Sequence, residues 1–209
     1  MNMETSVESD LLVSTVRRFV ETEMFPHEDE VDRLGYVPEE IGRQIEAKAQ
    51  ELGLYACNLP EAVGGVGLSF LEFARLGHVL GRSPLGHFIF GCSAPDAGNM
   101  ELLLKHGSGA QRDRWLEPLV SGELRSCFSM TEPDRAGSNP IHMDTVAVRD
   151  GDDYVITGRK WFTTGGHLAD VAICMAVTDP DAPAHGRASQ ILVPTDTPGF
   201  EHVRRIPIM

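Results

Sequence analysis

The sequence has few cysteines and no hydrophobic run long enough to cross a membrane, and each absence excludes a class of protein. The four cysteines stand far apart and include no C-x-x-C pair: Cys57, Cys92, Cys127 and Cys174. This spacing fits neither a zinc knuckle nor the disulfide framework of a small secreted domain, so we expect reduced thiols. No apolar stretch approaches the ~20 residues that a membrane-spanning helix needs, so no membrane span is predicted.

Basic residues are also scarce. The chain has 18 Lys and Arg against 31 Asp and Glu, a formal net charge of −13. This charge argues against nucleic acid and against an anionic membrane surface as partners. The first ten residues, MNMETSVESD, are acidic and contain no apolar core, which excludes both a secretory signal and an Arg-rich transit peptide. We therefore predict a cytoplasmic protein that does not bind nucleic acid.

Three common functional patterns are missing as well. The eight histidines are not paired at metal-ligand spacing, so no metal site is predicted. The loop at residues 59–67, LPEAVGGVG, is rich in glycine but lacks the spacing and the following Lys of a phosphate-binding loop, which favours a structural turn. Neither Ser126 nor Ser129 lies in a G-x-S-x-G elbow, which disfavours a hydrolase.

What remains is an ordinary globular composition of 209 residues, 42% hydrophobic and 23% charged. Apolar residues recur at helical spacing in the first part of the chain, over about 9–24, 38–52, 69–80, 96–105 and 110–120. After residue 124 the pattern changes to short β-branched and apolar runs, at about 125–130, 145–148, 154–157, 160–163, 171–177, 190–194 and 200–203. We predict an α+β chain, with an all-α domain over residues 1–122 and an antiparallel β-barrel or sandwich over residues 123–209.

Two segments of the β region share an unusual arrangement. Residues 127–140 read CFSMTEPDRAGSNP, and residues 158–166 read GRKWFTTGG. In each, an apolar run breaks into a turn of small and polar residues, with aromatic residues beside it. Hydroxyls, backbone N–H groups and an aromatic wall at strand ends can hold a flat ring with polar edges. Two ordinary β-turns have the same composition, so the spacing alone leaves both interpretations open.

The order of residues in the two segments is more specific than their composition. Residues 128–138, FSMTEPDRAGS, resemble the flavin-binding signature of the acyl-CoA dehydrogenase family. Residues 154–166, YVITGRKWFTTGG, resemble the second signature of that family and follow in the same order and at the same separation. The TEPD form of the first turn and the later ILVPTDTPG at residues 191–199 are similar to a subgroup associated with longer acyl chains.

The resemblance implies a fold and a reaction. In the family a helical domain, a β domain and a third domain of four helices follow one another, and we expect this chain to contain the first two without the third. The implied reaction is the α,β-dehydrogenation of a fatty acyl-CoA thioester to the trans-2-enoyl-CoA. The implied cofactor is FAD, the implied electron acceptor is an electron-transferring flavoprotein, and the full-length protein is implied to be a homo-oligomer.

The resemblance also implies which residues contact the cofactor: Phe128, Ser129, Met130, Thr131, Gly137, Ser138, Trp161, Phe162, Thr163 and Thr164. Ser138 is in addition placed near the CoA arm, and Gly137 is placed where a Cβ would obstruct close approach. Thr164 is the candidate for a hydroxyl near the flavin N5. Whether Trp161 or Phe162 forms the wall beside the flavin stays open at this point.

No residue of this chain is predicted to be the catalytic base. In the family a Glu from the third domain removes the α-proton, and Glu132 is instead expected to orient the first turn. We therefore expect the portion of a dehydrogenase that lacks its base. One alternative is a non-catalytic subunit that binds acyl-CoA or flavin and pairs with a full-length partner. Another is a related flavoenzyme such as an acyl-CoA oxidase, although the TEPD and WFTTGG forms favour a dehydrogenase.

Overall fold

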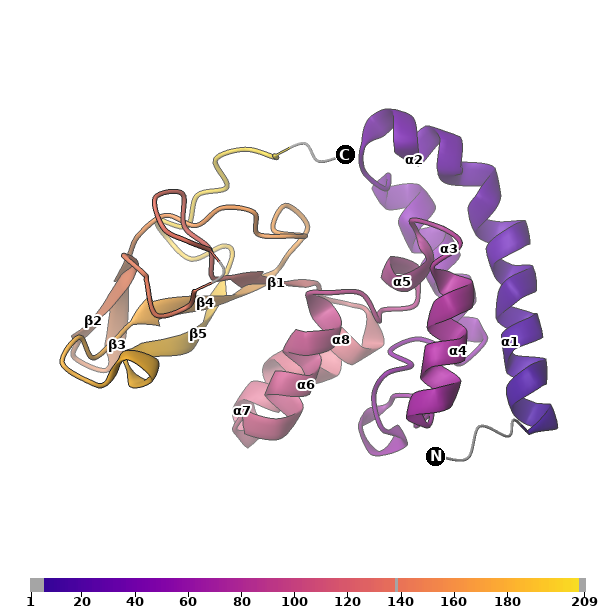
Figure 1. Ribbon diagram of the computed structural model, residues 1–209, viewed down its shortest axis with the longest axis horizontal. Coiled ribbons are helices and arrows are strands. Elements are labelled where there is room, and N and C mark those ends of the chain that lie inside the picture. The colour runs from indigo at the N-terminus through magenta and orange to yellow at the C-terminus, as the bar shows by residue number, and fades with distance from the viewer. Residues whose placement is uncertain (1–5, 138, 207–209) are drawn as a thin grey trace. The chain divides into compact units, whose positions relative to one another are not determined.

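The computed structural model describes residues 6–137 and 139–206, and the chain divides into two compact units, residues 1–123 and 124–209 (Figure 1). The first unit is helical. Its α-helices are α1 (Val7–Phe19), α2 (Glu28–Leu34), α3 (Glu39–Glu51), α4 (Phe70–Leu80), α5 (Gly86–Ile89), α6 (Asp96–His106), α7 (Gly109–Gln111) and α8 (Glu117–Ser121). Among the described residues, no helix is long and apolar enough to span a membrane.

The first helical segment extends further than the sequence suggests. The sequence pattern predicts a helix over about 9–24, but a π-helical turn (Val20–Met24) and a 3-10 turn (Phe25–His27) carry the chain from α1 directly into α2. Pro26 lies in the first turn of the new segment, where its missing N–H has no intrahelical acceptor and costs nothing. The path ends at Gly35, whose φ of 72° is the left-handed conformation typical of a residue after a helix.

The core of the helical unit lies where α1, α3, α4 and α5 pack together. α1 lies alongside α4 in this unit (Figure 1). The buried apolar residues of this cluster include Val16, Val20, Met24, Ile45, Ala49, Leu76, Leu80, Leu85, Ile89 and Phe90. These positions follow the helical periodicity of the sequence, and the buried stripes are therefore structural rather than functional.

The start of α4 is fixed by a reciprocal cap. The Ser69 hydroxyl accepts from the Glu72 N–H at 3.3 Å, and the Glu72 carboxylate accepts from the Ser69 N–H at 2.9 Å. We expect Ser69→Ala to lower the unfolding free energy of the helical unit by about 1 kcal/mol. Urea unfolding followed by Trp115 fluorescence in a Trp161→Phe background measures this. Ser14→Ala, at an exposed position in the middle of α1, is the control. An equal loss in both variants would contradict the capping role.

The second unit is built on one sheet. Its strands are β1 (Ser126–Ser129), β2 (Val146–Asp150), β3 (Asp153–Thr157), β4 (Val171–Val177) and β5 (Ala188–Pro194). β4 is the central strand: β5 pairs along its whole length, and β1 pairs with its first half on the opposite edge. Its buried residues, Val171, Ala172, Ile173, Cys174 and Ala176, explain the continuous apolar run in the sequence.

The order of a helical domain followed by a β domain is confirmed, but the strand pairing corrects the expected antiparallel barrel or sandwich. β1 and β2 run parallel to β4, while β2–β3 and β4–β5 are antiparallel, so the described strands form an open mixed sheet. The long connection from β1 to β4 contains the β2–β3 hairpin and gives the chain room to return in the same direction. Residues 160–163 and 200–203, expected as strands, are irregular.

Candidate functional site

The two signature segments meet directly after β1. The Trp161 N–H donates to the Thr131 carbonyl at 3.1 Å, and the Thr131 hydroxyl donates to the Trp161 carbonyl at 2.5 Å. A Cβ on Gly137 would lie 3.0 Å from the Thr131 side chain, so this glycine allows the first turn to close on Thr131. Tertiary structure thus joins residues that are 30 positions apart into one site.

A buried ion pair between Lys160 and Glu132 also connects the same two segments. The Lys160 ammonium donates to a Glu132 carboxylate oxygen at 2.8 Å and to the Met130 carbonyl at 3.0 Å. The Glu132 carboxylate also accepts from the backbone N–H groups of Asp144, at 2.6 Å, and Thr145, at 2.9 Å. Both side chains of the pair are buried, with 11% of Lys160 and 5% of Glu132 exposed. Such a pair is stable only because each charge is also hydrogen-bonded.

The hydrogen bonds decide the protonation state of Glu132. Burial by itself raises the pKa of this carboxyl group, but the bonds from Lys160, Thr145 and Asp144 outweigh burial and lower the pKa to about 2. Glu132 is therefore ionised at neutral pH. Its lone pairs are occupied by donors, so it orients the turn as the sequence predicts and is a very weak base.

The first signature turn closes on itself without leaving room for a ligand. Arg135 binds the Asp144 carboxylate through two nitrogens, at 2.7 and 2.5 Å, across the exposed side of the turn. This ion pair lowers the pKa of Asp144 through the Arg135 hydrogen bond. The space enclosed between residues 130 and 143 is only about 10 Å³. Any ligand of this turn must therefore lie against its outer surface.

Several backbone N–H groups of the two segments have no acceptor in the described part of the protein. The carbonyls of Met130, Thr131 and Trp161 each accept a hydrogen bond from within the protein. By contrast, five backbone N–H groups have no acceptor within residues 6–137 and 139–206: those of Met130, Thr131, Phe162, Thr163 and Thr164. The two segments therefore leave backbone amide donors available to a ligand that carries hydrogen-bond acceptors.

Two aromatic rings stand beside these amides. Trp161 is 36% exposed and Phe162 is 55% exposed, and their ring centroids lie 4.8 Å apart at 58°. Phe162 has a φ of 49°, a left-handed conformation that costs a non-glycine residue of order 1–3 kcal/mol. The backbone of Trp161 is anchored to Thr131 through both its N–H and its carbonyl.

The other predicted site residues have simpler surroundings. Ser129 is buried with its hydroxyl 4.0 Å from the Cys127 sulfur, and Phe128 is half-buried in β1. Ser138 lies outside the described residues. Sequence reasoning missed Lys160, Asp144 and Thr145. The Lys of the second signature was the available signal for Lys160, whereas nothing in the sequence marks two backbone amides as ligands of Glu132.

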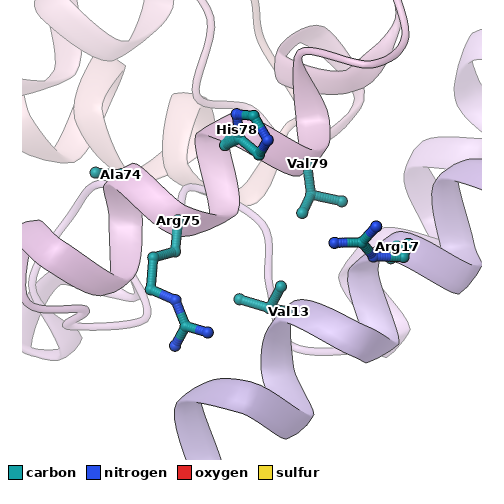
Figure 2. Close-up of a pocket in the computed structure, with 6 residues that line it drawn as sticks. All are labelled: Val13, Arg17, Ala74, Arg75, His78 and Val79. Carbon is teal, nitrogen blue, oxygen red and sulfur yellow. The ribbon is translucent and has the colours of Figure 1, made fainter. Parts of the chain in front are cut away.

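A larger concavity lies in the helical unit, between α1 and α4 (Figure 2). It has a volume of about 370 Å³ and is lined by Val13, Arg17, Ala74, Arg75, His78 and Val79. Arg75 is held by Ser9, at 2.6 Å, and by Asp10, at 2.5 Å. The groove has an apolar floor and a cationic rim, and none of its lining residues belongs to either signature segment.

Comparison with known families accounts for nearly all of the chain. The N-terminal domain of acyl-CoA dehydrogenase matches residues 6–123, and the middle domain of acyl-CoA dehydrogenase matches residues 127–208. The chain belongs to the acyl-CoA dehydrogenase family. Members of this family are FAD-using oxidoreductases. The resemblance inferred from the two signatures is therefore confirmed.

Individual relatives agree with this assignment. Acyl-CoA dehydrogenase family member 10 of Mus musculus is 37% identical over 203 residues, which are 91% of this chain and 19% of that protein. The crystal structure of acyl-CoA dehydrogenase from Geobacillus kaustophilus has a TM-score of 0.78 and 31% identity, over 93% of this chain and 50% of that one. A glutaryl-CoA dehydrogenase from Mycobacterium smegmatis in complex with FADH2 has a TM-score of 0.73 and 30% identity, over 93% and 47%. The chain thus spans half or less of each of these relatives.

Within the described residues, no group of three or more His, Cys, Asp or Glu side chains could hold a metal ion. The four cysteines all lie in the described part of the chain, where they are buried and form no disulfide. Cys57 and Cys92 both lie in the helical core, and the neighbouring Cys92 thiol lowers the pKa of Cys57.

Proposed function

We propose that this chain forms the flavin-contacting part of an FAD-dependent acyl-CoA dehydrogenase, which converts a fatty acyl-CoA thioester to the trans-2-enoyl-CoA. The observation that carries the proposal is the set of unpaired backbone N–H groups at the meeting point of the two signature segments, beside an exposed tryptophan. The isoalloxazine ring has acceptor atoms along its pyrimidine edge and at N5, and its flat face suits an aromatic wall.

Amide donors at this edge fit the electronic demand of the reaction. When bound, FAD would accept the hydride from the β-carbon of the substrate and gain negative charge at N1 and O2. Fixed donors stabilise such charge without reorganising, because they already point at the place where it develops. The carbonyls of Met130, Thr131 and Trp161, which would oppose this charge, are hydrogen-bonded inside the protein.

We assign the contacts residue by residue. The backbone N–H groups of Met130 and Thr131 would face the pyrimidine edge of the flavin. The backbone N–H groups of Thr163 and Thr164 would face its N5 and O4 atoms. Trp161 would be the wall beside the ring, because its backbone is hydrogen-bonded to Thr131. Phe162, by contrast, has a left-handed backbone conformation. Further contacts are proposed for Phe128, Ser129, Gly137 and Ser138 from their places in the signature.

The α-proton of the substrate must go to a carboxylate base other than Glu132. With a pKa of about 2 and three donors on its oxygens, Glu132 would have no driving force to take a proton at neutral pH. The base is therefore proposed to come from another part of the complete enzyme. We also propose a fatty acyl-CoA as substrate, an electron-transferring flavoprotein as electron acceptor, assembly as a homo-oligomer and a cytoplasmic location.

A fluorescence titration tests the flavin site. The chain has two tryptophans, so Trp115→Phe leaves Trp161 as the only reporter. We expect FAD to quench Trp161 emission to saturation and to remain bound, with a shifted visible spectrum, after free FAD is removed. Trp161→Phe is the matched control, in which the quenching assigned to Trp161 should be lost. FAD that binds without affecting Trp161, or that is not retained, contradicts the proposed site.

Addition of a long-chain acyl-CoA to the flavin-loaded chain then distinguishes binding of the cofactor from supply of the catalytic base. Bleaching of the flavin absorbance would mean that this chain also supplies a base. Retained flavin that does not bleach would mean that the chain binds the cofactor and depends on a base from elsewhere, as proposed here.

A further inference from the structure

Lys160 connects the two signature segments through a single buried ammonium group. Its two acceptors, the Met130 carbonyl at 3.0 Å and Glu132 at 2.8 Å, both belong to the first segment, whereas Lys160 itself belongs to the second. Only 11% of its side chain is exposed, so the ammonium is committed to these partners rather than to solvent. Removing a lysine ammonium from water costs free energy unless it gains partners such as these two acceptors.

The bond to Met130 has a geometric consequence for the next residue. The carbonyl of Met130 and the N–H of Thr131 belong to one planar trans peptide, in which they point in opposite directions. Fixing the carbonyl therefore fixes the N–H. The following peptide is fixed as well, because the Thr131 carbonyl accepts from the Trp161 N–H at 3.1 Å. With both flanking peptides held, the Thr131 N–H can point in only one direction.

The same bond has an electrostatic consequence. A charged donor on a carbonyl polarises the whole peptide group and makes its N–H a stronger hydrogen-bond donor. Glu132 balances most of the ammonium charge, and it is kept ionised by the amides of Asp144 and Thr145. The arrangement therefore strengthens one amide without leaving an uncompensated charge in the site.

We propose that Lys160 is a positioning residue that aims the Thr131 N–H at the bound flavin and strengthens it as a donor. This inference rests on the flavin site proposed above. Because the donor faces an edge that becomes more negative on reduction, Lys160 stabilises reduced flavin more than oxidised flavin. Lys160 acts through the Met130–Thr131 peptide and does not itself touch the cofactor.

The first test uses the chain without flavin. Lys160→Met combined with Glu132→Gln removes both charges of the pair and avoids a buried unpaired charge. We expect the ¹⁵N order parameter of the Thr131 N–H to fall from about 0.85 to below 0.6 in the folded double variant. Arg159→Met is the matched control, because it removes an exposed cation one residue away. An unchanged order parameter in a folded double variant overturns the proposal.

The second test measures the flavin midpoint potential of the same variants. We expect the double variant to bind reduced FAD at least tenfold more weakly, relative to oxidised FAD, than the wild-type chain does. For a two-electron couple this is a potential about 30 mV lower. Loss of packing alone would weaken the binding of oxidised and reduced FAD equally and leave the midpoint potential unchanged. That result would overturn the claim that Lys160 strengthens the Thr131 N–H as a donor. If the wild-type chain retains no flavin, the proposed function fails, and the order parameter alone decides whether Lys160 positions Thr131.

Discussion

Replacing Glu132 by Gln is expected to lower the unfolding free energy of the β unit by roughly 3–5 kcal/mol at neutral pH and by almost nothing near pH 2. The carboxylate accepts hydrogen bonds from Lys160, Asp144 and Thr145 in a buried site. Gln keeps the shape but leaves the Lys160 ammonium without its counter-charge. The cost is that of a buried unpaired charge, which is one of the largest effects of a single substitution.

The pH range follows from the pKa of Glu132 in the two states. Hydrogen bonds lower it to about 2 in the folded protein, against 4.5 for an unperturbed Glu. Above pH 4.5 the carboxyl is ionised in both states and contributes its full stabilisation. As the pH falls from about 4.5 to about 2, the unfolded chain takes up the proton first, and about 3 kcal/mol is lost.

Unfolding in urea at several pH values measures this effect, with Trp161 fluorescence in the Trp115→Phe background as the signal from the β unit. The stability of the wild-type chain and that of Glu132→Gln should converge between pH 4.5 and pH 2. The comparison cancels other carboxyls whose pKa is also lowered and does not depend on Glu132, such as Glu23 and Glu72. Parallel loss of stability in both proteins would show that Glu132 is not ionised and paired as described.

Gly158→Ala is expected to destabilise the β unit by about 1–3 kcal/mol or more, although Gly158 itself is exposed. An added Cβ would lie 2.2 Å from the hydroxyl oxygen and 2.7 Å from the Cα of Thr145. Thr145 cannot move away, because its N–H donates to Glu132 and its carbonyl accepts from the Val177 N–H at 2.8 Å. The strain would therefore spread to the carboxylate that holds Lys160.

The same urea unfolding measures the loss, and two further variants sharpen the comparison. Gly186→Ala is the matched control, because its Cβ would meet only the Ala182 Cβ at an ordinary 3.7 Å. Thr145→Ala should not rescue Gly158→Ala, since the Cα and Cβ of residue 145 remain too close after the hydroxyl is removed. Rescue, or equal stability of the Gly158→Ala and Gly186→Ala variants, would contradict the close packing of these two segments.

Local sequence was enough to predict the longer helices and most strands, whereas the short helices α2 and α5 lie outside the predicted helical ranges. The stripe of Ile45 and Ala49 in α3 and the apolar run of β4 record a burial pattern that each element carries by itself. Residues 160–163 were expected as a strand on the same grounds. They are irregular because their hydrogen bonds are made with Thr131 and Met130, far along the chain, and a local pattern holds no information about such partners.

The family and the two segments that meet at the site were determined by the sequence itself, because TEPD and WFTTGG are short, contiguous and specific. Only the tertiary structure decided how the strands pair and how the site is held together. The parallel pairing of β1 with β4, and the bonds from Lys160 to Glu132 and Met130, join residues that are 28 or more positions apart. Contacts between residues so far apart in sequence depend on the path of the whole folded backbone. The residue types at the two positions do not determine that path.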